Sequence, residues 1–319
     1  MTAARPRIKR DLARWYVRHA PGTLGKAAIL DGFLNAELRD YPVKRRTRTR
    51  FGATVTTDTQ DLIQRYLYLF GTWEPNLTGW LTSRLKPGDT FVDVGANIGY
   101  YSLLASRLVG ESGNVVAIEA SPTFHKVLAA NAAANRCDNL RAVNAAVSDR
   151  EENLTFALAS SHNMGANSIV PYAGEAESTF EARARMLPDV LTSDEVARAR
   201  VIKIDVEGAE GAVVRSLEPI LDRLRPDVEL AVEVTPQRMA ELGFSAEELL
   251  ETFTSRGFHV YRMANDYAAG SYPGALRRGA QAPVRWRGPA VSLYTSDAAD
   301  DLIGVDLGGG RIIKKKKKP

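Results

Sequence analysis

A short apolar segment that ends in a glycine-rich turn constrains this chain more than any other part of its sequence. Thr90 to Val94 form the kind of short apolar run that makes a buried parallel strand. The turn Gly95-Ala96-Asn97-Ile98-Gly99 follows, and apolar residues then recur with helical spacing as far as Leu108. A strand that leads into a helix across a glycine turn presents free helix amides and bare backbone to a ligand. We therefore expect a ligand site at this turn.

A second short apolar run, Val115 to Glu119, ends on an acidic residue. A carboxylate at the tip of the second strand can accept hydrogen bonds from both hydroxyls of a ribose, as it does in nucleoside-binding βαβ units. The turn and this acid together predict a nucleoside site in which Glu119 holds the ribose.

The turn favours S-adenosylmethionine (SAM) over a dinucleotide. A dinucleotide site needs a glycine in the middle of the turn so that the backbone can touch the pyrophosphate, and this chain has Asn97 there. Asp93 would repel a phosphate, whereas SAM has no phosphate and carries a sulfonium and an ammonium. Two alternatives stay open: an NAD-linked oxidoreductase on a similar sheet, and a non-catalytic partner-binding protein that keeps the fold.

Apolar runs and helical segments alternate along most of the chain, which predicts an α/β fold with a doubly wound parallel sheet. Further strands are expected at Leu140–Val147, Val201–Asp205, Asp227–Val234 and Phe258–Met263, with Ala290–Thr295 pairing with the last of these, and a hairpin at Arg46–Phe51 and Ala53–Thr57. Helices are expected at 6–20, at Gln60–Phe70 with Asp58 as its cap, after Ser121, and after Ser245.

Three segments follow from this pattern. Residues 1–88 are expected to form an N-terminal cap of helices and a hairpin, and residues 89–295 the SAM-binding domain. Residues 296–319 have no periodicity and contain three consecutive glycines and five consecutive lysines. This composition is unlike the rest of the chain, and we expect the tail to be disordered and without function.

Charge is unevenly distributed along the chain. Residues 1–50 contain 13 Lys and Arg against 4 Asp and Glu, a net charge of +9, whereas residues 51–295 contain 23 against 30, a net charge of −7. The mildly acidic main part disfavours a nucleic-acid partner. The single cysteine, the lack of a long apolar run and the lack of a signal-peptide pattern indicate a cytoplasmic protein.

The predicted first helix is basic and amphipathic. One face carries Ile8, Leu12, Trp15, Tyr16 and His19, and basic residues surround that face. The simpler interpretation is a helix that packs on the domain or lies in water. The alternative is a weak contact with an anionic membrane surface or another partner.

Two motifs resemble the FkbM family of SAM-dependent methyltransferases. They are VDVGANIGYY at Val92–Tyr101 and IKIDVEGAE at Ile202–Glu210, and the resemblance extends over roughly Phe51–Tyr261. The resemblance implies a class I methyltransferase fold, a Rossmann-like sheet of about seven strands with an antiparallel last strand, in residues 89–295. It also implies methyl transfer to oxygen on a sugar, a glycan or a secondary metabolite.

The resemblance also implies roles for individual residues. Gly95 and Gly99 would let the backbone approach the methionine part of SAM, and Asp93 and Asn97 would bind its ammonium, its carboxylate or an ordered water. Glu74 would reach SAM from the cap, or lie in a surface turn. The residues expected to bind SAM are Glu74, Asp93, Gly95, Ala96, Asn97, Gly99, Glu119, Asn144, Ala146 and Asp205.

The expected catalytic residues are Asp205, Glu207 and His162. A hydroxyl acceptor must lose a proton, and Asp205 or His162 would accept it. The alternatives are that Asp205 only orients SAM and that His162 is an ordinary exposed histidine. Asp205, Glu207 and Glu233 could hold Mg²⁺, but acids so placed serve equally well in salt bridges and caps, so no metal is assigned.

Overall fold

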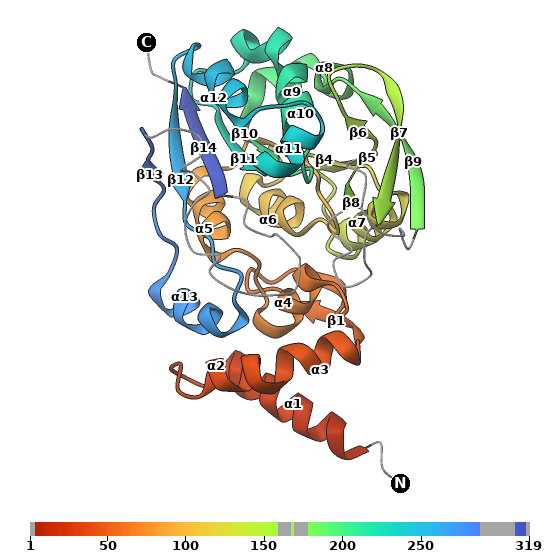
Figure 1. Cartoon of the computed structure of the whole chain (residues 1–319), viewed down its shortest axis with the longest axis vertical. Coiled ribbons are helices and arrows are strands. Elements are labelled where there is room, and N and C mark those ends of the chain that lie inside the picture. Colours follow the sequence, from red (N-terminus) through yellow and green to blue (C-terminus); the bar gives the residue numbers. More distant parts are fainter. Residues whose placement is uncertain (1–3, 159–166, 169–177, 288–309, 317–319) are drawn as a thin grey trace.

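The computed structural model describes residues 4–158, 167–168, 178–287 and 310–316 (Figure 1). Its central feature is an eight-stranded sheet with the strand order β13-β12-β14-β11-β10-β3-β4-β5. The five strands from β11 to β5 run parallel to one another, whereas β12, β13 and β14 pair antiparallel. The predicted α/β class with a mostly parallel sheet is confirmed, although the described residues give eight strands where the sequence predicts about seven.

Alternation along each central strand gives the sheet two apolar faces. In β3, Phe91 packs on one side and Val92 and Val94 on the other. The sheet strands are β3 (Thr90–Val94), β4 (Asn114–Glu119), β5 (Leu140–Asn144), β10 (Ala199–Ile204), β11 (Glu229–Val234), β12 (Phe258–Met263), β13 (Val284–Arg285) and β14 (Gly310–Lys316).

Helices cover both faces of the sheet, as a doubly wound fold requires. The first face packs against helices that precede β5, namely α4 (Leu62–Phe70), α5 (Pro75–Arg84), α6 (Tyr100–Val109) and α7 (Pro122–Ala134). The second face packs against later helices, among them α8 (Leu187–Val190), α9 (Ser193–Arg198), α10 (Glu210–Leu217), η3 (Glu218–Arg223), α11 (Pro236–Glu241) and α12 (Ala246–Thr254). Ser121 and Ser245 cap α7 and α12 as predicted.

The N-terminal segment forms one end of the molecule (Figure 1). It contains α1 (Ala4–His19), α2 (Lys26–Ile29), the π-helix η1 (Leu30–Leu34), α3 (Asn35–Asp40) and the hairpin β1 (Lys44–Arg48) and β2 (Thr54–Asp58). The predicted hairpin is confirmed with shifted bounds. The predicted cap of α4 is wrong: Asp61 accepts the Gln64 N–H at 2.9 Å, because the helix begins at Leu62.

A late segment of the chain packs on this N-terminal part. It comprises η4 (Ala269–Ser271) and α13 (Tyr272–Arg278). Tyr272 stacks on Phe70 of α4 with ring centroids 4.8 Å apart, and the Tyr66 hydroxyl donates to the Tyr267 carbonyl oxygen at 2.5 Å. None of the helices in the described ranges combines the length and the apolar character needed to cross a bilayer.

A second, smaller sheet stands beside the end of β5 and has the order β6-β9-β7-β8. Its strands are β6 (Ala146–Val147), β7 (Glu152–Leu158), β8 (Asn167–Ser168) and β9 (Ser178–Arg185). The prediction of one continuous strand at Leu140–Val147 is therefore wrong. The strand divides after Asn144, because Ala146 leaves the main sheet to pair with Ala184 of β9.

The C-terminal tail also departs from the prediction. Residues 310–316 form β14, so the prediction of disorder is wrong for them. Their backbone pairs on one side with β11 and on the other with β12, which satisfies hydrogen-bonding groups on both facing edges. The strand predicted at Ala290–Thr295 and the rest of the tail lie outside the described residues.

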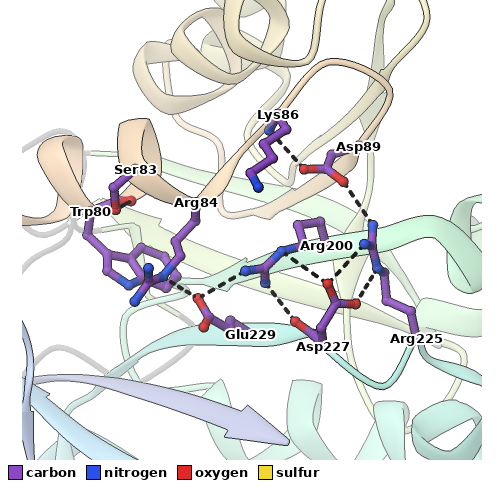
Figure 2. Close-up of polar contacts among 9 residues, drawn as sticks. All are labelled: Trp80, Ser83, Arg84, Lys86, Asp89, Arg200, Arg225, Asp227 and Glu229. Atoms are coloured by element: carbon purple, nitrogen blue, oxygen red, sulfur yellow. Dashed lines mark hydrogen bonds and ion pairs between the residues drawn. The ribbon is translucent and has the colours of Figure 1, made fainter. Parts of the chain in front are cut away.

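A charged network joins α5 to the amino ends of the central strands (Figure 2). Arg84 of α5 lies 2.9 Å from Glu229 of β11, a side chain that is only 2% exposed. Nearby, Arg225 donates to Asp89 at 2.8 Å and to Asp227 at 2.6 Å. These contacts fix the edge of the sheet opposite the glycine turn, where no cofactor is expected.

Candidate active site

The turn after β3 brings backbone from two strands into close approach. Gly95 has φ 78°, and a Cβ there would lie 1.8 Å from the carbonyl oxygen of Asp205. A larger residue at this position would therefore displace the end of β10. Asn97 also has a positive φ, 51°, and its side-chain oxygen accepts the Ile98 N–H at 2.7 Å. Gly99, with φ 89°, precedes the first turn of α6.

Glu119 connects the tip of β4 to this turn. One carboxylate oxygen accepts the Asn97 N–H at 2.7 Å and the other accepts the Ser121 N–H at 2.9 Å. Burial raises the pKa of Glu119 to about 7. Each oxygen can accept a further hydrogen bond, so the carboxylate can still receive two hydroxyl donors.

Asp93 is fully buried and joins the end of β3 to α6 and β10 through two side-chain hydrogen bonds. It accepts a hydrogen bond from the Ser102 hydroxyl at 2.6 Å and another from the Lys203 ammonium at 3.1 Å. Lys203 also donates to the Gly95 carbonyl oxygen at 3.2 Å and lies 3.4 Å from Asp205. This lysine therefore links the tips of β3 and β10 between two carboxylates.

The turn, Glu119 and Lys203 line one cavity with an apolar wall. The space between its walls is about 1000 Å³, counted out to its open mouth. Phe156 of β7 and Phe180 of β9 lie in that wall and stack with centroids 5.0 Å apart. Other lining side chains are Ile63, Trp73, Tyr101, Phe124, Ala145, Ala146, Val147, Asp205 and Glu207.

These residues fit SAM. Gly95 lets the turn lie directly against the end of β10, so that the turn and Asp205 line the same cavity. Glu119 has the acceptor capacity that a ribose needs, and the small apolar side chains Ala145, Ala146 and Val147 suit a flat base. The acids of the cavity suit the positive sulfonium and ammonium of SAM.

The structure separates the residues predicted to bind SAM into two groups. Those that line the cavity are Gly95, Ala96, Asn97, Glu119, Ala146 and Asp205. Asp93 and Gly99 lie behind the turn and support it. Asn144 does not line the cavity, because its amide donates to the carbonyl oxygens of Glu119 and Ala120 at 2.8 and 3.0 Å. The individual roles remain predictions.

Glu74 lies behind the cavity wall rather than in it. Its carboxylate accepts hydrogen bonds from Asn265 at 2.6 Å, from the Tyr267 hydroxyl at 2.8 Å and from the Tyr101 hydroxyl. Its backbone has φ 38°, a left-handed conformation at the start of α5. Glu74 therefore ties the N-terminal cap to α6 and to the loop after β12, while its neighbour Trp73 lines the cavity.

Two of the three predicted catalytic residues lie at the cavity. Asp205 and Glu207 both line it, on the loop between β10 and α10. Glu207 also pairs with Arg238 at 2.7 Å. The third, His162, lies outside the described residues.

Glu233 joins Asp205 and Glu207 in an acidic group. One oxygen from each of the three carboxylates lies within 4.8 Å of the others. Acidic groups at this spacing are common without an ion, and nothing else at this group indicates a ligand, so we assign no metal to it.

Phe156, Phe180 and Lys203 are among the cavity residues that were not predicted from the sequence. Phe156 and Phe180 meet only because β7 and β9 pair in the smaller sheet. The sequence does single out Lys203, because a lysine inside an otherwise apolar buried strand is uncommon unless it has a charged partner. Its partner Asp93 lies far away in the sequence, so the sequence gives no means of pairing them.

The comparisons with known proteins agree with this geometry. Residues 93–260 match the family model of the methyltransferase FkbM domain, which covers more than half of the chain. The chain belongs to the FkbM methyltransferase family. This FkbM protein is accordingly a SAM-dependent methyltransferase by family. Among curated protein sequences, none matches it significantly.

Several solved structures are similar to this FkbM protein at low identity. A putative rRNA methylase from Clostridium thermocellum has 10% identity and a TM-score of 0.43, over 78% of this chain and 99% of that one. A SAM-dependent O-methyltransferase from Thermotoga maritima has 14% identity and a TM-score of 0.39, over 86% and 78%. An FkbM methyltransferase from Methylobacillus flagellatus has 12% identity and a TM-score of 0.39, over 65% and 50%. These values carry no argument about the substrate.

Proposed function

We propose that this FkbM protein transfers a methyl group from SAM to a hydroxyl oxygen of a sugar, a glycan or a secondary metabolite. The observation that carries the proposal is that the SAM-type turn, Glu119 and the carboxylates Asp205 and Glu207 line a single cavity. A cofactor seated on the turn and a base for the acceptor would then share one cavity. A cytoplasmic location is part of the proposal, and the single cysteine supports it.

SAM, when bound, supplies the activated methyl group. The chain's own task is to align a hydroxyl oxygen with that methyl carbon, because alignment at about 3 Å accounts for much of the rate of such displacements. Phe156 and Phe180 stack in the apolar wall of the same cavity and lower its polarity. The acceptor hydroxyl loses its proton as the new bond to carbon forms, and we assign that proton to the carboxylate of Asp205.

Lys203 supports this assignment of Asp205. The ammonium lies 3.4 Å from the Asp205 carboxylate and holds it at the end of β10. A buried lysine in this position can orient the carboxylate without taking its place as acceptor, since an ammonium has no free lone pair. Glu207 is the weaker candidate for the same role, because its ion pair with Arg238 is shorter, at 2.7 Å, than the 3.4 Å between Lys203 and Asp205.

The first experiment separates methyl transfer from the alternatives. Isothermal titration should show binding of SAM and no binding of NAD, which would set aside the oxidoreductase. Incubation with methyl-labelled SAM and a library of hydroxylated sugars, glycans and metabolites should then yield an O-methylated product. Label on nitrogen or carbon would refute O-methylation, and SAM binding without turnover of any acceptor would favour the non-catalytic alternative.

The second experiment tests the base. Asp205→Asn should lower kcat by about 10²- to 10⁴-fold, with the dissociation constant of SAM changed by no more than about threefold. The control is Asp194→Asn on α9, whose side chain is 73% exposed and which should leave both constants unchanged. A loss of SAM affinity equal to the loss of kcat would assign Asp205 to cofactor binding instead.

A further inference from the structure

Large hydrophobic side chains exposed to water gather on α1 and the turn that follows it. Ile8, Leu12 and Trp15 are 61%, 63% and 60% exposed, and Leu24 is 86% exposed. Among the described residues only Tyr41 and Val284 add to this set. The spacing of four and then three residues places Ile8, Leu12 and Trp15 in one row along the helix, which we call the α1 stripe. Such a cluster indicates a contact with something outside the chain.

The orientation of α1 departs from that of an ordinary surface helix, because arginines lie beside Ala13 and Val17 on the side that packs on the body. A surface helix packs its apolar face on the core and turns its charges to water. In α1, Arg14 donates to the Tyr68 carbonyl oxygen at 3.0 Å and lies 4.0 Å above the Tyr68 ring. Arg18 donates to the same carbonyl oxygen at 3.1 Å. The arginines therefore face the body while the α1 stripe faces water.

The acceptors of these arginines explain why this orientation is stable. The Tyr68 carbonyl belongs to the last turn of α4, which carries the negative end of the helix dipole. Burial nevertheless lowers the pKa of Arg18 to about 10, with Arg14 and Arg50 close by as further causes. The fold thus keeps cations partly desolvated and leaves the α1 stripe exposed.

Positive charge surrounds the end of the molecule that holds the α1 stripe. The first fifty residues carry a net charge of +9. Lys9 of α1 is exposed, and so are Arg45, Arg46 and Arg48 of β1, which lies at the same end of the molecule (Figure 1). A second copy of this chain would bring an equally positive end to the contact and would be repelled. An anionic occupant with an apolar interior matches both the charge and the α1 stripe.

We propose that α1 docks this protein on the surface of an anionic lipid bilayer. The α1 stripe enters the boundary between headgroups and acyl chains, where the indole of Trp15 suits the interface. The exposed basic side chains of α1 and β1 lie against the lipid phosphates. The helix lies on the membrane and does not cross it. Because α1 contacts α4 and the neighbouring N-terminal helices rather than the cavity, docking is separate from the proposed methyl transfer.

Sedimentation with lipid vesicles tests this proposal on the full chain. Vesicles of phosphatidylcholine with about one-third phosphatidylglycerol should carry the protein down at low salt, and high salt should release it. Vesicles of phosphatidylcholine alone should bind far less. The variant Ile8→Ser/Leu12→Ser/Trp15→Ser should lower the partition coefficient at least about tenfold, because it removes the apolar contribution. Trp15→Phe should bind as the wild type does but lose the blue shift of tryptophan emission.

A matched control uses an exposed hydrophobic residue elsewhere. Val284→Ser, at a position 71% exposed on β13, should bind vesicles as the wild type does. SAM affinity measured on every variant should equal that of the wild type, which shows that the fold is intact. Equal sedimentation of the triple variant and the wild type would overturn the proposal. So would a stable dimer in solution that the triple variant dissociates, because a second copy would then cover the α1 stripe.

Discussion

The pKa of Glu119 should make SAM binding depend on pH, and Glu119→Gln tests this. In the protein without cofactor, burial raises the pKa of Glu119 to about 7, although two backbone N–H groups already donate to it. Ribose hydroxyls are further donors, and they bind a carboxylate more tightly than a protonated acid. SAM binding should therefore lower the pKa of Glu119, and affinity should rise as the pH is raised through about 7.

The magnitude follows from the fraction of Glu119 that is ionised. With a pKa of about 7, roughly a tenth of the carboxyl groups are ionised at about pH 6 and most are at about pH 8. If the ionised form provides the binding, the dissociation constant at about pH 6 is about tenfold higher, a difference of about 1.4 kcal/mol. Glu119→Gln should raise the dissociation constant at about pH 8 by a similar factor and remove the dependence on pH.

Isothermal titration of SAM across this pH range measures both effects. The control is Glu210→Gln, because burial raises the pKa of Glu210 to about 7 as well. Glu210 accepts the Gly208 N–H at 3.0 Å and does not line the cavity, so this variant should keep the pH dependence of the wild type. If Glu119→Gln keeps the wild-type pH dependence or the wild-type affinity, the assignment of Glu119 to the ribose is refuted.

Three further predictions concern the turn, the charged network and the buried acids. Gly95→Ala should abolish the SAM binding measured by titration, because its Cβ would lie 1.8 Å from the carbonyl oxygen of Asp205. The control is Gly22→Ala, which also has a positive φ but has nothing within 4 Å of its Cβ, and it should keep SAM binding. Glu229→Ala should lower the free energy of unfolding in urea by about 2 kcal/mol, since it removes a buried carboxylate that pairs with the partly exposed Arg84 (Figure 2). Glu218→Ala, in an exposed pair, should cost less than about 1 kcal/mol. The folded state keeps the proton of Glu210 up to about pH 7, whereas the unfolded chain loses it near pH 4.5. This acid should therefore make the free energy of unfolding fall as the pH rises between those values. Glu210→Gln should make the free energy of unfolding, measured in urea, depend less on pH in that range.

The sequence brought the glycine turn and Glu119 together because their signals are local. Gly95 and Asn97 lie within one turn, and Glu119 follows at the tip of the next strand. In a parallel sheet, consecutive strand tips meet at one edge, so these residues could be placed together without knowledge of the rest of the fold. The structure places all three in the lining of one cavity.

The aromatic wall of the cavity and the contacts of Glu74 could not be predicted in the same way. Phe156 and Phe180 come together through the register of an antiparallel pair, which an alternating pattern does not determine. The family resemblance placed Glu74 near the cofactor, but its partners Asn265 and Tyr267 lie in a loop about 190 residues later. Contacts at such distances leave no mark on local periodicity, and β14 was missed for the same reason.

The position of Lys203 between two carboxylates also bears on how the spent cofactor leaves. Lys203 offsets only one of the charges that Asp93 and Asp205 bring to this end of the cavity, so an excess of negative charge remains. SAM carries a positive sulfonium that this charge attracts, whereas S-adenosylhomocysteine has a neutral thioether and loses that attraction. The negative charge that attracts SAM should thus leave S-adenosylhomocysteine less tightly held. Each catalytic cycle would then end in a complex from which the product readily dissociates and is replaced by SAM.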